Sequence, residues 1–140
     1  MRVLGIDLGD RNIGIAVSDK LLITAQALDR YRVKSKDEDK KYFKELVEKY
    51  EIVKIVVGLP LRMDGSIGTQ AEKAKIFAHW LEEILHLPVV FWDERLTTVQ
   101  ALKILSQQKI KIKRKKILKD QVSATLILSS YLESKRRGAQ

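Results

Sequence analysis

Large apolar side chains take every second position in residues 3–8 and again in residues 13–18. A period of two is typical of β-strands. Because the turn-forming residues 9–12 separate the two segments, the pattern predicts an antiparallel hairpin. The alternate positions of its second strand are small, which leaves room for another element to pack closely. We expect a third strand within residues 22–33.

Two helices and a buried strand are predicted after the hairpin. Ser35 and Glu38 form a capping box, which predicts a helix that begins there. Residues 52–57 are almost all β-branched and apolar, as in a central strand covered on both faces. Thr69 and Glu72 form a second capping box, and apolar residues recur after it at helical spacing.

The remaining pattern predicts one more strand and two more helices. Residues 88–92 are typical of a buried strand, and Thr97 with Gln100 caps a third helix. A last helix is expected over residues 118–135.

The order β-β-β-α-β-α-β-α-α indicates an α/β fold with one mixed five-stranded sheet and helices on both faces. This is a ribonuclease H-like arrangement. A flavodoxin-like fold would need a helix directly after the first strand, and residues 9–13 leave no room for one. With 140 residues, 45% of them hydrophobic, we expect a single domain over residues 1–140.

Composition narrows the function classes. The chain has no cysteine, which excludes a disulfide framework and a thiolate metal site. The sequence contains no apolar run of the length that a membrane span or a signal peptide needs. We therefore expect a cytoplasmic protein with no membrane partner.

The charge balance favours a polyanion as partner. Lys and Arg number 27 against 18 acids, a net charge of +9. Residues 109–119 are the densest basic segment and contain Lys113, Arg114, Lys115 and Lys116. Their position directly before Asp120, a candidate site residue, favours contact with phosphates. The alternative is a solvated charged surface on a basic protein.

Asp7 is the first candidate for chemistry. It lies near the end of the first predicted strand, on the face opposite Leu4, Ile6 and Leu8. A carboxylate among apolar neighbours is costly to desolvate, so a metal, a basic side chain or backbone donors must compensate. The alternative is an aspartate that only caps the following turn.

Further acids occur where elements end or begin. Asp93 and Glu94 follow the last predicted strand, and strand ends are where α/β sheets hold ligands. Asp120 lies at the start of the last helix. Each acid taken alone has a structural explanation as a helix-start residue or an ion-pair partner. Together with Asp7 they form a set of carboxylates without His or Cys, which is the ligand set expected for Mg²⁺ or Mn²⁺.

The loop over residues 58–68 is a further candidate. It lacks the Gly-Lys-Ser/Thr ending of a phosphate-binding P-loop. Arg62 and flexible glycines beside a strand end predict a substrate-contacting loop. A plain crossover loop explains the same residues.

The motifs together resemble the YqgF family, described as pre-16S rRNA nucleases or Holliday junction resolvase-like proteins. The resemblance covers essentially the whole chain, and its order and spacing are specific. It rests on Gly5-Ile6-Asp7-Leu8-Gly9, Gly58-Leu59-Pro60, Asp93-Glu94-Arg95-Leu96-Thr97-Thr98 and Lys119-Asp120.

This resemblance implies a metal-dependent nuclease of the ribonuclease H-like superfamily that acts in 5′-end maturation of pre-16S rRNA. It implies that Asp7, Glu94 and Asp120 are the catalytic and metal-binding residues, with Mg²⁺ or Mn²⁺ as cofactor. The rest of the middle motif, Arg95, Thr97 and Thr98, is implied to position substrate. The expected partners are structured RNA or branched DNA and ribosomal precursor particles.

Three alternatives remain at this point. A resolvase would cut four-way DNA and work as a two-fold dimer, whereas we expect a monomer or a weak homodimer. A non-catalytic nucleic-acid-binding factor in transcription would bind without needing metal. An actin-like ATPase would need two such domains, and this chain supplies one.

Overall fold

The computed structural model describes residues 1–96 and 123–138. Its first strands, β1 (Arg2–Leu8) and β2 (Asn12–Ser18), pair antiparallel, and β3 (Ala25–Arg32) pairs antiparallel with β2. The predicted hairpin and third strand are therefore confirmed.

The remaining elements alternate between helix and strand. They are α1 (Lys36–Tyr50), β4 (Ile52–Leu59), α2 (Thr69–Leu85), β5 (Val89–Asp93) and α5 (Ser123–Gly138). The sheet has the order β3-β2-β1-β4-β5, in which β1, β4 and β5 run parallel. The predicted α/β fold, ribonuclease H-like with a mixed five-stranded sheet, is confirmed. The helix expected after Thr97 and residues 118–122 of the last helix lie outside the described part.

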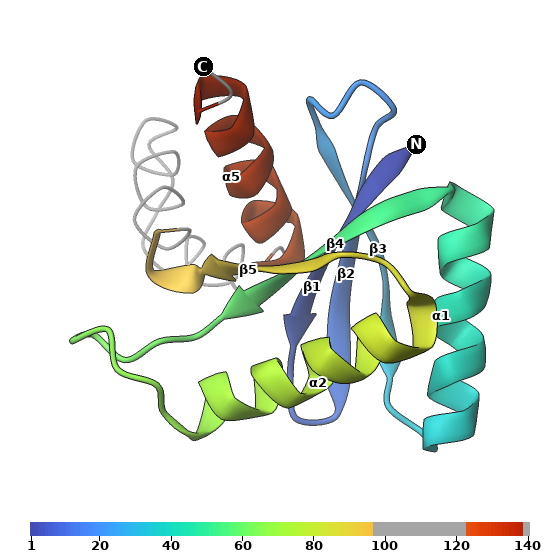
Figure 1. Ribbon diagram of the computed structural model, residues 1–140, viewed down its shortest axis with the longest axis horizontal. Helices are drawn as coiled ribbons and strands as arrows, with labels where there is room; N and C mark the ends of the chain where they lie inside the picture. Colours follow the sequence, from blue (N-terminus) through green and yellow to red (C-terminus); the bar gives the residue numbers. More distant parts are fainter. Residues whose placement is uncertain (97–122, 139–140) are drawn as a thin grey trace, which may run out of the picture.

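Helices cover both faces of the sheet (Figure 1). Leu4 and Ile6 of β1 pack toward α1 and α2 in a core with Phe43 and Leu81. The alternate positions of β1 face α5, where Val3 joins a second core. Asp7 shares the parity of Val3 and therefore lies on the α5 face of the sheet. Within residues 1–96 and 123–138, no helix is long and apolar enough to cross a bilayer.

Small residues let α5 approach the sheet closely. A Cβ at Gly5 would lie 2.7 Å from Cβ of Leu128. A Cβ at Gly14 would lie 3.5 Å from the Cβ atoms of both Ala124 and Asp7. The small positions expected in the second strand thus bring the start of α5 beside Asp7.

The helix start predicted at Ser35 is confirmed. Ser35 accepts a hydrogen bond from the Glu38 N–H at 3.1 Å and donates to its carboxylate at 3.3 Å. The second box is wrong, because Gly68 is the N-cap of α2 and its carbonyl accepts the Glu72 N–H at 3.0 Å. Thr69 is already the first helical residue, so its side chain is one position too late to cap.

Candidate active site

The ends of β1 and β5 bring two candidate carboxylates to one edge of the sheet. Asp7 lies near the end of β1, and Glu94 directly follows β5. Glu94 reaches inward across β4, where a Cβ at Gly58 would lie 3.1 Å from its Cδ. A Cβ at position 58 would crowd this path. The geometry therefore brings together Asp7 and Glu94, which the sequence placed far apart.

The two carboxylates repel each other in a partly buried setting. Burial, the charge of Asp7 and the charge of Asp93 raise the pKa of Glu94 to about 7. Burial also raises the pKa of Asp7, and the guanidinium of Arg30 opposes that shift. A pair of half-buried acids with raised pKa values is stabilised by a bound cation, and such pairs are concentrated at functional sites.

Asp93 has a different role from Glu94. Arg95 donates to both carboxylate oxygens of Asp93 at 2.7–3.1 Å, and its backbone N–H donates to the same group at 2.9 Å. These bonds hold the pKa of Asp93 below its usual range. The resemblance implies Glu94 as the site residue and leaves open whether Asp93 also contributes; the geometry turns Glu94 toward Asp7 and Asp93 toward Arg95.

Arg95 also joins the site to the loop that precedes α2. Its Nη1 donates to the carbonyl of Met63 at 3.3 Å, and its guanidinium packs against Gly65. Gly65 has a φ of +87°, a conformation that a side chain disfavours. The structure thus shows Arg95 bound to Asp93 and to this loop, and its predicted contact with substrate stays a prediction.

Arg62 lies within the same loop. Its backbone closes a turn with Ser66, at 3.0 Å from N to O. Its guanidinium lies against the start of α2, where Nε is 2.8 Å from the position of a Cβ at Gly68. The structure thus places Arg62 on the loop between β4 and α2, and its predicted contact with substrate stays a prediction.

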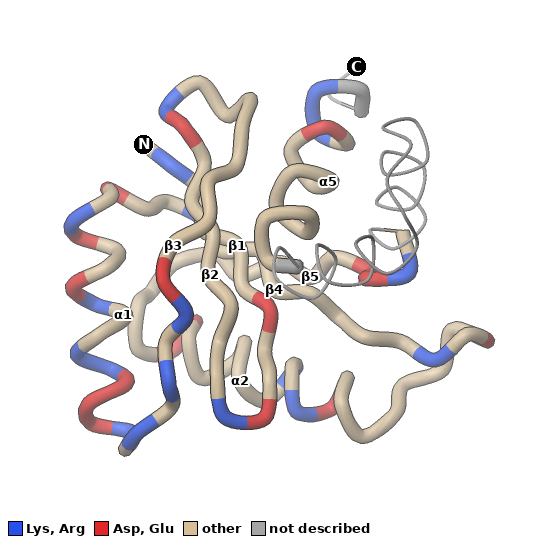
Figure 2. Tube along the Cα trace, turned by 180° about the vertical axis from the view of Figure 1, so that it is seen from behind, with Lys and Arg blue, Asp and Glu red and all other residues tan. Residues whose placement is uncertain are grey.

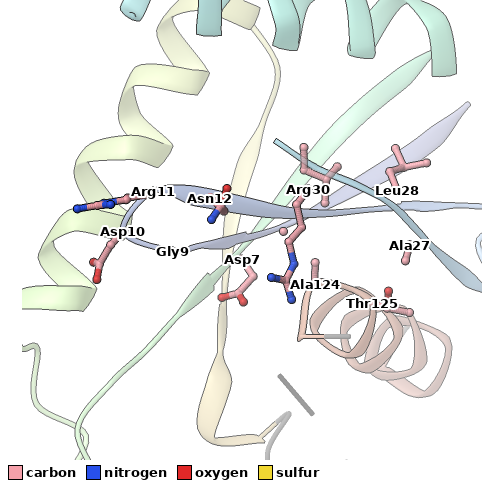
Figure 3. Close-up of a pocket in the computed structure, with 12 residues that line it drawn as sticks. Asp7, Gly9, Asp10, Arg11, Asn12, Ala27, Leu28, Arg30, Ala124 and Thr125 are labelled. Atoms are coloured by element: carbon pink, nitrogen blue, oxygen red, sulfur yellow. The ribbon is translucent and has the colours of Figure 1, made fainter. Parts of the chain in front are cut away.

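A cavity of about 480 Å³ opens beside Asp7 (Figure 3). Its walls come from the β1–β2 turn, β3 and the first turn of α5. Charged positions gather in that turn and along β3 (Figure 2). Sequence reasoning did not identify the cavity. The side chains that it missed there are Arg11, Asn12, Arg30 and Thr125.

Several predicted site residues lie outside the described part of the chain. They are Thr97, Thr98, Lys113, Arg114, Lys115, Lys116 and Asp120. Within the described ranges, no group of three or more His, Cys, Asp or Glu side chains is placed to hold a metal ion. The three-carboxylate site thus stays a prediction, of which the structure brings Asp7 and Glu94 together.

Known proteins resemble this chain over nearly its whole length. A protein of Caldanaerobacter subterraneus subsp. tengcongensis named "Putative pre-16S rRNA nuclease" is 51% identical over 138 residues, which covers 97% of this chain and 99% of that protein. A protein of the same name from Halothermothrix orenii is 46% identical over 132 residues, 94% of each chain.

The fold also has a solved counterpart. The structure of T. thermophilus RuvC in complex with a Holliday junction substrate superposes with a TM-score of 0.59 at 18% identity, over 99% of this chain and 97% of that one. This likeness confirms the fold. The family model RuvX, described as Holliday junction resolvase, matches residues 1–134. Together with the identity to the two relatives, this match shows that the chain belongs to the RuvX family, also known as YqgF, as its motifs indicated.

Proposed function

We propose that this protein is a metal-dependent nuclease that hydrolyses phosphodiester bonds in 5′-end maturation of pre-16S rRNA. The observation that carries the proposal is the pairing of Asp7 and Glu94 at one edge of the sheet, with the pKa of Glu94 raised to about 7. The names of the relatives support the substrate. The proposed setting is the bacterial cytoplasm, on ribosomal precursor particles.

The described residues fit a divalent cation. Asp7 and Glu94 offer hard oxygen ligands, and a bound cation would offset the burial and the mutual repulsion that raise the pKa of Glu94. We propose Asp120 as the third ligand and Mg²⁺ or Mn²⁺ as the metal. Bound there, such an ion supplies an activated water and stabilises charge on the scissile phosphate.

The protein's own groups position that chemistry. Gly58 leaves space for Glu94 to reach the site, and Arg95 pairs with Asp93 so that this second acid does not compete. We propose that residues 109–119, Thr97 and Thr98 contact the substrate, as does Arg62 on the loop between β4 and α2.

The direct test compares wild type with Asp7→Asn on a labelled precursor-rRNA fragment in Mg²⁺, in Mn²⁺ and in chelator. We expect cleavage by wild type in metal only, and none by the variant, while binding is retained. Asp37→Asn is the matched control, because Asp37 lies in the first turn of α1, on the other face of the sheet. Full activity of Asp7→Asn in a preparation free of other nucleases would contradict the proposal.

A second candidate is cleavage of four-way DNA junctions, which the RuvX family description and the RuvC fold favour. It predicts paired, symmetric cuts by a two-fold dimer. A four-way junction in the same assay, with the mass of the protein in solution, separates the two substrates. Salt-sensitive binding without cleavage in any metal would favour a non-catalytic nucleic-acid-binding factor in transcription.

A further inference from the structure

A β-bulge in the second hairpin turns one arginine toward the carboxylate pair. In the β2–β3 register Ile13 faces Tyr31, whereas Ile15 faces Leu28. Gly14 of β2 therefore lies opposite two residues of β3, Asp29 and Arg30. Bulges of this kind re-aim side chains and are frequent next to active sites.

The bulge changes which face Arg30 occupies. In a regular strand, residues 28 and 30 would share one face. Here Leu28 and Tyr31 both pack into the core on the α1 and α2 side, although they are three residues apart. Arg30 is thereby directed to the opposite face, which is that of Asp7 and α5. Figure 3 shows its side chain extending toward the space between Asp7 and Ala124.

Arg30 lines the cavity beside Asp7, together with Arg11 and Asn12 of the β1–β2 turn. At about 480 Å³ the cavity falls in the range of about 300–1,000 Å³ that holds small ligands or single groups of larger ones. Its lining pairs two arginines, Arg11 and Arg30, with two aspartates, Asp7 and Asp10. Of the two arginines, Arg30 extends toward Asp7 (Figure 3), and its guanidinium fork matches the oxygens of a phosphate.

We propose that Arg30 binds a backbone phosphate of the substrate strand next to the scissile bond, and that the nucleotide carrying this phosphate lies in the cavity. This inference rests on the proposed function, because it takes Asp7 as part of the cleavage site. The ligand chemistry is the phosphodiester backbone, which RNA and DNA share. Arg30 is thus a substrate-binding residue that neither the motifs nor the family comparison identifies.

The competing explanation is that Arg30 serves only as counter-ion to Asp7. In the proposed function, however, the charge of Asp7 is shared with a divalent cation. Asp7 then neutralises Arg30 less, and a phosphate in the cavity gives the guanidinium fork a second anion, whereas a pure counter-ion role needs no substrate.

The test removes the counter-ion role first. In the Asp7→Asn background, residue 7 carries no charge and no cleavage is expected, so binding can be measured in Mg²⁺. Fluorescence anisotropy across a salt series then compares Asp7→Asn with Asp7→Asn/Arg30→Gln, on a precursor-rRNA fragment and on a four-way DNA junction. The matched control is Asp7→Asn/Arg2→Gln, because Arg2 lies at the opposite end of β1, with its guanidinium over Tyr50.

We expect Arg30→Gln to weaken binding about tenfold and to reduce the salt slope by about 0.7–0.9, the loss of one phosphate contact. The Arg2→Gln control should leave both unchanged. Weaker binding to only one of the two probes, RNA or DNA, also supports the proposal and identifies which nucleic acid places a phosphate in the cavity. Affinity and slope equal to those of Asp7→Asn on both probes would overturn it.

Two further measurements keep the result interpretable. If Arg30→Gln unfolds, Arg30→Lys serves instead, because it keeps the charge and loses the fork; we then expect a smaller loss of affinity. Cleavage by wild type is assayed separately. If wild type does not cleave but Arg30→Gln weakens binding, the proposed nuclease function is rejected and the phosphate contact is retained. If wild type cleaves but Arg30→Gln has no effect on binding, the phosphate contact is rejected and the nuclease function is retained.

Discussion

Glu94 crosses β4 over Gly58, with its Cδ 3.1 Å from where a Cβ of residue 58 would lie. The same Cβ would lie 2.6 Å from Cδ1 of Ile127 in α5. Gly58 therefore sets both the position of a candidate catalytic carboxylate and the distance between α5 and the sheet.

Gly58→Ala should thus damage activity more than its small size suggests. We expect kcat to fall at least about tenfold as Glu94 is displaced, and the free energy of unfolding to fall by about 1–3 kcal/mol from overpacking. Steady-state cleavage and urea unfolding measure the two effects. Gly14→Ala is the control for unfolding, because its added Cβ meets only ordinary contacts at 3.5 Å. Wild-type kcat in Gly58→Ala would show that Glu94 need not lie there.

Glu94 should make the metal-free protein less stable as pH rises. Its pKa is about 7 in the folded state against 4.5 for an ordinary glutamate, so between these values the folded state holds a proton that the unfolded state has released. Stability is therefore lost as pH rises from 4.5 to 7, by at most about 3 kcal/mol.

Glu94→Gln should remove this loss, so the variant should be more stable than wild type at pH 8 and similar to it at pH 4. Urea unfolding in chelator across this range measures the difference. Glu45→Gln, at an exposed position of α1, is the matched control. The same pH dependence in Glu94→Gln as in wild type would contradict the assignment.

The affinity for metal should depend on the same protonation of Glu94. A cation competes with the proton on Glu94, so affinity for Mg²⁺ or Mn²⁺ should tighten as pH rises toward 7, by at most about tenfold per pH unit. Above pH 8 it should level off. Calorimetric titration in buffers of different ionisation enthalpy reports the released proton. Affinity that does not change between pH 5.5 and 8 would show that Glu94 is not a ligand.

Arg95 should act through the groups that it holds. Arg95→Lys loses the two-pronged pairing with Asp93 and weakens the bond to the Met63 carbonyl. We expect faster hydrogen exchange in residues 60–68 and an upward shift in the pH midpoint of activity, because a less neutralised Asp93 repels Glu94 more. Arg136→Lys, at a bond to the carbonyls of Leu22 and Ile23, is the control. Unchanged exchange and midpoint would indicate that Arg95 acts only on substrate.

The fold was predictable because its signals are local. The period of two in the first hairpin, the β-branched run of β4 and the Ser35 cap each depend on neighbouring residues. The Thr69 cap was wrong because Ser/Thr-x-x-Glu also fits a helix that begins one residue earlier. Gly68 is the N-cap of that helix, and its carbonyl accepts the first backbone hydrogen bond of the helix, from the Glu72 N–H.

The site was only partly predictable. Asp7 and Glu94 could be proposed because an acid at a strand end is visible in the sequence. Arg30 could not, because a strand pattern gives no sign of the bulge that turns it to the face of Asp7. The crossing of Gly58 by Glu94 likewise depends on two strands that meet only in the folded sheet.

The central claim is that Asp7 and Glu94 together carry phosphodiester hydrolysis. Single-turnover cleavage of a 5′-labelled precursor-rRNA fragment in Mg²⁺, by wild type, Asp7→Asn and Glu94→Gln in parallel, tests it most directly. The account predicts cleavage by wild type and rates at least about 10³-fold lower for each variant, with substrate still bound. Cleavage by either variant at a rate within about twofold of wild type would contradict it.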